Sequence, residues 1–382
     1  MSYSNHIEIS KSALEQNINF IRQQLLRHTR LSCVVKGNAY GHGIPIIIPL
    51  EEDMGINHFS VFNAEEAYQV KQVSKRNSTI MIMGMLTQEQ VHWAVEQEVE
   101  FYIFERERLQ EAEEAAKKIG KPALIHLEVE TGMNRTGVPF ELLEEFVLKI
   151  DRSPHLQLKG VCTHLAGAES ISNYYRVKKQ TITYQKILRK LQGMGITPQN
   201  RHIASSAATL RHPNTQMDMV RVGILQYGFF PNEETFTHYI TKKTDYDYPL
   251  KRIISWKSQV MSLKDIQQGE FVGYGTSYFA HSPMTIATVP VGYGHGYSRS
   301  LSNQGRVIIN GHFAPVVGTI NMNMICVDVS NIPNIQKGDE VVLIGKQDEL
   351  EISVASFSDF SNQINYELLT RLPIDIPRIV VE

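Results

Sequence analysis

Short runs of β-forming residues alternate with longer segments of helical periodicity over about the first 230 residues, and this alternation constrains the fold most strongly. It is typical of a parallel sheet whose strands are connected by helices. Eight strands over about 220 residues fit a (β/α)8 barrel better than a doubly wound sheet, which usually has fewer strands. The predicted strands are Leu31–Val35, His58–Phe62, Thr79–Met83, Glu100–Phe104, Ala123–Val129, Gln157–Thr163, His202–Ala204 and Met219–Gly223.

Capping and stop signals predict where several helices begin and end. Ser12 and Glu15 form a capping-box pattern at the start of the first helix. Two later helices, Glu107–Ile119 and Val177–Met194, each end just before a glycine, as C-terminal caps require.

The pattern of predicted elements changes after about residue 240, where β-type runs follow one another with few helical segments between them. Turn signals such as Asn310-Gly311 separate some of these runs, as an antiparallel domain needs. We therefore predict an α/β chain with a (β/α)8 barrel over residues 1–238, a predominantly β C-terminal domain over residues 239–382, and Pro231–Pro249 as connector. The β-type runs are Arg252–Ser262, Met284–Gly292, Arg306–Ile309, Met324–Val329, Glu340–Ile344 and Arg378–Val381.

Composition excludes several classes of partner. The 382 residues include 38 Lys and Arg against 40 Asp and Glu, so the formal charge of −2 offers no basic excess for a nucleic acid. The N-terminus has no secretory signal pattern, and no apolar run approaches the ~18 residues of a membrane span. Cys33, Cys162 and Cys326 lack the spacing of a metal site or disulfide framework. We expect a cytoplasmic protein with reduced cysteines, no metal, and no nucleic-acid or membrane partner.

Lys36 is the first candidate for chemistry. Active sites of such barrels are built at the carboxyl ends of the strands, and Lys36 leaves the first predicted strand into a glycine-rich turn. Burial lowers the pKa of an ammonium and frees a nucleophilic amine that can form a Schiff base. Taken alone, a lysine at a strand end is more often a surface residue.

Other polar residues follow the remaining strands at the same expected rim. They are Arg135 after the fifth strand, His164 after the sixth, Ser206 after the seventh, and Arg221, Gly223 and Ile224 at the eighth. The small residues and backbone N–H groups at Ser206, Gly223 and Ile224 suit a phosphate approached closely by main chain. A phosphate-bearing cofactor with a carbonyl for Lys36 satisfies this set, and pyridoxal 5'-phosphate meets both needs.

With these residues in place, the sequence resembles the alanine racemases, which are pyridoxal-phosphate enzymes with a (β/α)8 barrel followed by a β domain. The resemblance runs over nearly the whole chain, from His6–Ile9 to Pro377–Arg378. Its most specific motif is Lys36-Gly37-Asn38-Ala39-Tyr40-Gly41-His42-Gly43. The supporting motifs are Val220-Arg221-Val222-Gly223-Ile224, Gly269-Glu270-Phe271-Val272-Gly273-Tyr274-Gly275 and Val291-Gly292-Tyr293.

The resemblance implies a homodimer with shared active sites and a two-base racemisation that interconverts L- and D-alanine. Lys36 would carry the cofactor and act on one face of the substrate, while Tyr274 of the partner subunit acts on the other. Two groups on opposite faces of one carbon are what racemisation requires, because one removes the proton that the other replaces. Tyrosine is a weak base unless its phenolate is stabilised, and His164 with Arg221 would orient and activate it.

The resemblance also assigns the remaining contacts of the cofactor and substrate. Arg221 would meet the pyridine nitrogen, where an arginine can only donate, and this favours racemisation over transamination or decarboxylation. The phosphate would contact Tyr40, Tyr366 and Ser206, with the backbone of Gly223 and Ile224. Arg135, Tyr293 and the backbone N–H of Met322 of the partner subunit would contact the substrate.

Several positions depart from the family pattern. Glu128, seven residues before Arg135, replaces a lysine that many members carbamylate, so we predict that Glu128 pairs with Arg135 directly or through water. The alternative is that Glu128 packs against the barrel wall.

The neutral residues Thr319, Asn321 and Asn323 replace charged or thiol groups near the substrate entrance of the family. They leave open a racemase for serine or another small amino acid. A non-catalytic pyridoxal-phosphate-binding protein on the same barrel is a further alternative. The leading prediction is an alanine racemase supplying D-alanine for the cell wall.

Overall fold

The computed structural model describes residues 3–241, 243, 247–355 and 365–382. Contacts divide the chain into two compact units. The first unit comprises Ala13–Ala39 and Ile47–Lys251, and the second comprises Met1–Ser12, Tyr40–Ile46 and Arg252–Glu382.

The first unit is built on eight parallel strands in the order β8-β7-β6-β5-β4-β3-β2-β9. Their bounds are β2 Arg30–Val34, β3 His58–Val61, β4 Thr79–Ile82, β5 Glu100–Ile103, β6 Ala123–Glu128, β7 Leu156–Cys162, β8 Asn200–His202 and β9 Met219–Val222. Backbone bonds from Asp218 N to Arg201 O (3.1 Å) and from Arg221 N to Ala204 O (2.9 Å) join the outermost strands into a nearly closed barrel. The predicted barrel is confirmed, and each predicted strand overlaps an observed one.

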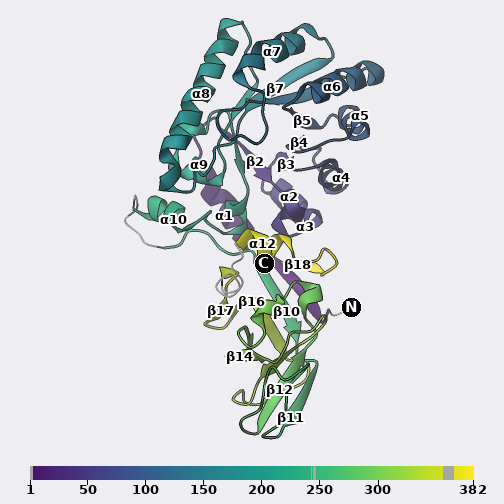
Figure 1. Cartoon of the computed structure of the whole chain (residues 1–382), viewed down its shortest axis with the longest axis vertical. Coiled ribbons are helices and arrows are strands. Elements are labelled where there is room, and N and C mark those ends of the chain that lie inside the picture. The colour runs from purple at the N-terminus through teal and green to yellow at the C-terminus, as the bar shows by residue number, and fades with distance from the viewer. Residues whose placement is uncertain (1–2, 242, 244–246, 356–364) are drawn as a thin grey trace. The chain divides into compact units, whose positions relative to one another are not determined.

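Helices connect these strands and lie outside them, as α4 to α8 do in Figure 1. The helices are α1 Lys11–Gln24, α2 Lys36–Tyr40, α3 Ile44–Asp53, α4 Ala64–Val73, α5 Gln88–Glu96, α6 Arg106–Ile119, α7 Leu143–Arg152, α8 Tyr174–Gly193, α9 Ser206–Arg211 and α10 Glu233–Ile240. The predicted helices at α6 and α8 are confirmed. The predicted capping box is wrong in detail, because α1 begins at Lys11 and Ser12 therefore lies in its first turn.

Local sequence explains why these helices dock on the barrel. In α7 the buried residues Leu143, Phe146, Val147 and Ile150 recur at helical spacing on one face. Burying each such side chain contributes roughly 1.5–3 kcal/mol, so one apolar stripe holds the helix against the strands. Thr87 forms a complete capping box at the start of α5.

The second unit contains a ten-stranded sheet in the order β11-β12-β15-β14-β13-β16-β10-β1-β18, with β17 paired to β16. Its strands are β1 Asn5–Ser10, β10 Ile254–Gln259, β11 Ser262–Ile266, β12 Met284–Val289, β13 Arg306–Ile309, β14 His312–Val317, β15 Ile325–Asp328, β16 Glu340–Gln347, β17 Leu350–Ile352 and β18 Arg378–Val381. One short helix, α12 (Asn365–Thr370), also belongs to this unit. The predicted β-rich C-terminal region is confirmed.

The boundaries of the units differ from the predicted division at residue 238. Strand β1 belongs to the second unit, where it pairs antiparallel with β10 and parallel with β18. Ile7 and Ile9 on β1 are fully buried, and this burial explains why the N-terminal strand joins the β sheet. The predicted connector Pro231–Pro249 contains α10 in its first half, and residues 242 and 244–246 lie outside the described residues.

Three expectations concern membrane spans, metal sites and cysteines. In the described part of the chain, no helix has both the length and the apolar character needed to cross a bilayer. The same residues contain no group of three or more His, Cys, Asp or Glu side chains placed to hold a metal ion. Cys33, Cys162 and Cys326 are free thiols, as expected.

Gly41 provides a test of packing in the second unit. Its φ of +83° lies in the left-handed region, and an added Cβ would overlap the carbonyl oxygen of Leu369. We expect Gly41→Ala to lower the free energy of unfolding by about 3 kcal/mol or more, measured by urea denaturation. Gly269→Ala is the matched control, because Gly269 has a similar φ of +92° with open space around it. Its cost should be about 1 kcal/mol, and equal losses would contradict the clash.

Candidate active site

The candidate residues of the first unit come from the carboxyl ends of its strands. Lys36 follows β2, His164 follows β7, Ser206 follows β8, and Arg221 lies on β9. Since parallel strands end at the same rim, these side chains are brought to one end of the barrel. Arg221 lies near enough to Lys36 and His164 for its charge to lower the pKa of both groups.

The backbone after Lys36 is unusual. Gly37, Asn38 and Ala39 have φ values of 63°, 52° and 54°, so the chain makes a left-handed turn directly after the lysine. Left-handed conformation costs roughly 1–2 kcal/mol for each residue other than glycine, and surrounding structure must hold it. Glu66 does so in part, because its carboxylate accepts from Gly37 N at 2.6 Å and from Phe62 N at 2.8 Å.

Lys36 has the electrostatics of a reactive amine. Partial desolvation lowers the pKa of its ammonium, and the positive charges of Arg135 and Arg221 lower it further. Glu66 opposes the effect but does not cancel it. A larger fraction of the free amine is therefore present near neutral pH, as a nucleophile or proton acceptor requires.

His164 is neutral near pH 7. Desolvation, together with the charges of Arg221, Arg135 and Lys36, lowers its pKa to about 3. A neutral imidazole adds no further positive charge to this rim, and it can accept one hydrogen bond while donating another.

Arg221 is held rigidly, with only 6% of its surface exposed. Its Nη1 contacts His202 Nδ1 at 2.6 Å and donates to His202 O at 2.7 Å, and its Nη2 donates to Thr163 O at 2.8 Å. A guanidinium has five N–H donors, so donors remain for a ligand after these three contacts.

Ser206, Gly223 and Ile224 form a second group that suits an anion. Ser206 begins α9, and Ile224 begins the short 3-10 helix Ile224–Tyr227. The first N–H groups of a helix have no acceptor within it, so they are suited to bind an anionic group. Gly223 N donates to Ser206 Oγ at 3.1 Å, which places the hydroxyl beside this backbone.

Glu128 does not pair directly with Arg135, so this part of the prediction is wrong. Among the described residues no ion pair joins these two side chains; Glu128 is 6% exposed, at the end of β6, and Arg135 is exposed. Burial raises the pKa of the Glu128 carboxyl, while a hydrogen bond from Thr136 and the charges of Arg221 and Arg135 partly offset the rise. The arginine charge reaches Glu128 through space without a contact.

The second unit carries the other candidates. Gly294 N donates to Met322 O at 2.8 Å and Tyr293 N donates to Asn321 O at 3.0 Å, so the Tyr293 turn and the Met322 segment lie together. Tyr274, 72% exposed, lies in the loop between β11 and β12, and another residue of that loop, Ser277, accepts from Thr319 Oγ1 at 2.9 Å.

Two further tyrosines belong to the second unit. Tyr40 ends the left-handed turn of α2 and is half-buried. Tyr366 lies on α12, but its side chain is outside the described residues.

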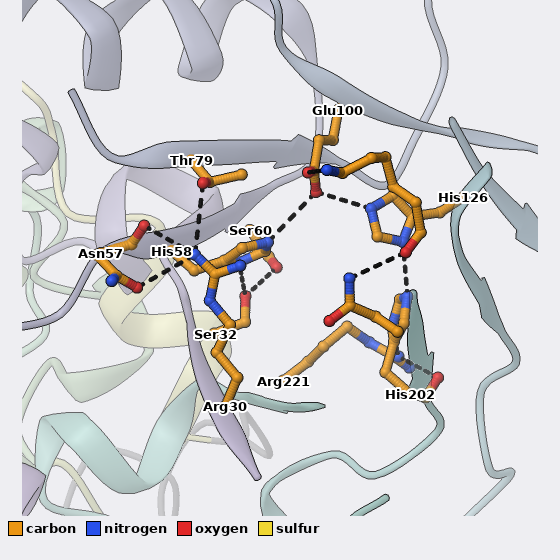
Figure 2. A network of polar contacts seen from close by, with 12 residues as sticks. Arg30, Ser32, Asn57, His58, Ser60, Thr79, Glu100, His126, His202 and Arg221 are labelled. Atoms are coloured by element: carbon orange, nitrogen blue, oxygen red, sulfur yellow. Dashed lines mark hydrogen bonds and ion pairs between the residues drawn. The ribbon is translucent and has the colours of Figure 1, made fainter. Parts of the chain in front are cut away.

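Sequence reasoning missed the buried partners of Arg221. His202, His126 and Glu100 lie inside the barrel and are connected to Arg221 by hydrogen bonds (Figure 2). The sequence could have pointed to them, because they are polar residues within predicted strands, and buried strands of a parallel barrel are otherwise near-continuous apolar runs.

Replacing Glu128 by glutamine tests its charge state. The pKa of the Glu128 carboxyl is higher in the folded protein than in the unfolded chain. The stability linked to its protonated form is therefore fully present below the unfolded pKa and is lost as pH rises through the folded pKa. Glu128→Gln should therefore match the parent protein near pH 4 and become more stable than it as pH rises, measured by urea denaturation. Glu141→Gln, at an exposed site, should show no such trend. Progressive destabilisation of Glu128→Gln with rising pH would instead support an ion pair with Arg135.

Comparison with known proteins agrees with this geometry. Residues 9–231 match the family model described as alanine racemase, N-terminal domain, and residues 253–380 match the alanine racemase, C-terminal domain. An alanine racemase of Leptospira interrogans is 33% identical over 381 residues, covering 100% of this chain and 97% of the relative.

The chain is also similar to solved structures of alanine racemases. An alanine racemase of Clostridium difficile 630 has a TM-score of 0.92 at 27% identity, covering 100% of this chain and 96% of that one. An alanine racemase of Bartonella henselae with covalently bound pyridoxal phosphate has a TM-score of 0.85 at 28% identity, with both chains covered completely. By two family models that together span most of its length, the chain belongs to the alanine racemase family.

Proposed function

We propose that this protein is a pyridoxal-phosphate-dependent alanine racemase that interconverts L- and D-alanine. The observation that carries the proposal is Lys36, a lysine of lowered pKa beside Arg135 and Arg221 at the carboxyl end of a (β/α)8 barrel. Membership of the alanine racemase family identifies the reaction for which that lysine is suited.

The residues present fit the cofactor. When bound, pyridoxal phosphate supplies a carbonyl for an amine and an electron-poor ring that acidifies the substrate's α-hydrogen. Ser206, with the backbone N–H groups of Gly223 and Ile224, forms a donor set suited to the phosphate, to which we add Tyr40 and Tyr366. Arg221 is suited to donate to the ring nitrogen.

Two groups exchange the proton in this proposal. The Lys36 amine serves one face of the substrate α-carbon, and the Tyr274 hydroxyl serves the other. His164 and Arg221 orient and activate Tyr274, while Arg135, Tyr293 and the backbone of Met322 bind the substrate. Arg221 cannot transfer its proton to the ring nitrogen, which favours prompt return of the substrate proton over other outcomes.

Alanine is the substrate, and we place the reaction in the cytoplasm, where it would supply D-alanine for the cell wall. The free thiols of Cys33, Cys162 and Cys326 suit a reducing compartment. Asn321 O accepts from Tyr293 N, and Thr319 and Asn323 lie two residues away along the chain, so a change of substrate preference would arise in this segment.

The first test follows single enantiomers by chiral chromatography. We expect the purified protein to interconvert L- and D-alanine. It should interconvert the enantiomers of serine, lysine and glutamate more slowly than those of alanine. Lys36→Ala should lower the rate on the order of 10³-fold, because it removes a proton-transfer group, whereas the exposed Lys179→Ala should not change it. Serine turning over faster than alanine would reassign the substrate. A bound chromophore with no interconversion of any amino acid would favour a non-catalytic pyridoxal-phosphate-binding protein.

We further infer that the protein acts as a homodimer in which residues 239–382 of one protomer complete the site of the other. Tyr274, Tyr293 and Met322 are all exposed in the single chain, and exposed aromatic and thioether groups are typical of an interface. A two-fold dimer presents the same surface twice, so two equivalent shared sites would form.

Mixing two defective variants tests this sharing. Tyr274→Phe should impair proton exchange with one enantiomer far more than with the other, because only one face loses its acid–base group. Lys36→Ala chains can be dissociated and reassociated with Tyr274→Phe chains. About half of the dimers are then mixed and one of the two sites in each is intact, so the mixture should regain about a quarter of the parent rate. No recovery, with dimers verified by sedimentation, would contradict shared sites. Equal small effects of Tyr274→Phe on both enantiomers would remove Tyr274 from the chemistry.

A further inference from the structure

A continuous chain of polar side chains crosses the interior of the barrel (Figure 2). It starts at Arg221 on β9, near the candidate site, and passes to His202 at 2.6 Å, then to His126 at 2.8 Å, then to Glu100 at 2.8 Å. Glu100 is the first residue of β5, so the chain ends at the amino end of the strands. Its four members are at most 6% exposed.

The chemistry of arginine gives this chain a single direction. A guanidinium can only donate, so His202 Nδ1 is the acceptor and its proton resides on Nε2. His202 Nε2–H then donates to His126 Nδ1, and His126 Nε2–H donates to Glu100 Oε2. Three consecutive donations therefore end on a carboxylate, and the tautomer of each histidine is determined by the arginine at one end.

Positive and polar groups surround the Glu100 carboxylate from four strands. His126 on β6 is 2.8 Å away, His58 on β3 is 3.5 Å away, and Lys159 on β7 is 3.8 Å away. Arg30 on β2 interacts with Glu100 through space: burial lowers the pKa of its guanidinium, and the Glu100 charge partly offsets that lowering. Burial acts to raise the pKa of Glu100, but hydrogen bonds from His126 and His58 outweigh it and hold the carboxyl well below its usual range.

The barrel wall is shaped to admit this chain. Strand β7 has no side chain at Gly160, where a Cβ would overlap His126 Nδ1. The pairing of β6 with β7 shifts register at the same point, because Ile125 pairs with Leu158 and His126 with Gly160, which leaves an extra residue on β7. Burying an unpaired charge in an apolar barrel is costly. Here every link of the chain is hydrogen-bonded, so the Glu100 carboxylate is buried with partners.

We propose that Glu100 is a positioning residue for Arg221: its carboxylate terminates the directed chain through His126 and His202 and thereby holds in place the guanidinium that would donate to the cofactor. This inference rests on the proposed function for its consequence, whereas the hydrogen bonds of the chain are formed among protein side chains alone. The negative charge draws each imidazole proton toward it, which makes His202 Nδ1 a stronger acceptor for Arg221. Arg221 is then held at His202 and Thr163 and cannot rotate away.

Glu100→Gln tests the charge while preserving the shape of the side chain. In cofactor-free protein, nitrogen-15 NMR of the histidine rings should show His126 and His202 as Nε2–H tautomers, with both ring protons moving upfield in the variant. In the loaded enzyme, kcat should fall on the order of tenfold with little change in KM, because a charged acceptor is replaced by a neutral one. The absorption maximum of the bound cofactor should shift as well.

Glu51→Gln is the matched control. Glu51 is fully buried on α3, and burial raises its pKa to about 8, so its carboxyl is largely protonated near pH 7 and glutamine resembles it. We expect no change in the His126 and His202 signals, in kcat, or in absorption. A loss equal to that of Glu100→Gln would show that any buried carboxyl matters and would overturn the proposal.

His126→Leu provides a second variant if Glu100→Gln folds poorly. It interrupts the chain while leaving the Glu100 carboxylate with His58 and Lys159. The proposal requires a similar fall in kcat, and requires the double variant to be no worse than His126→Leu alone. Additive losses would overturn it.

The outcomes separate this proposal from the function on which it rests. A parent protein that racemises no amino acid removes the proposed function, whereas the NMR signals of cofactor-free protein still report on the chain. An active parent protein whose Glu100→Gln variant keeps both kcat and the histidine signals overturns the role of Glu100 alone.

Discussion

Parallel pairing of the barrel strands is the interaction on which the rest of this structure depends. Each strand delivers its carboxyl end to the same rim, so residues far apart in sequence, such as Lys36, His164 and Arg221, become neighbours. The helices on the outside are held by single apolar stripes and leave that rim to the loops. The chemistry is therefore a consequence of topology first and of individual contacts second.

The rim gathers positive charge, and the barrel interior compensates for it. Desolvation lowers the pKa values of Lys36 and His164, and the charges of Arg135 and Arg221 lower both further. The opposite charge is Glu100, at the far end of the strands and connected through two neutral histidines. Among the described residues, Glu66 is the carboxylate that raises the pKa of Lys36, and it does not cancel the lowering.

Much of the fold could be predicted because its signals are local. Strands such as Thr79–Ile82 are short, buried runs between polar helices, and α6 ends at a glycine in the left-handed conformation. Strand β1 was missed because its short run gives no sign of its partners β10 and β18, which lie far along the chain. The motifs around Lys36 and Arg221 located the candidate site, whereas the contact expected between Glu128 and Arg135 depends on side-chain directions that spacing does not contain.

Periodicity and short motifs reflect local backbone geometry, and they were enough to predict the barrel, the β-rich region after it, the family, and the residues at the strand ends. The contacts among those residues, the desolvation of their charges and the tautomers of the buried histidines became known only from the folded chain. The reason is physical: hydrogen bonds and electrostatic shifts depend on distances of a few ångströms between strands that are distant in sequence. Glu100 illustrates the difference, since in the sequence it is one carboxylate among forty acidic residues, and in the fold it ends the chain that holds Arg221.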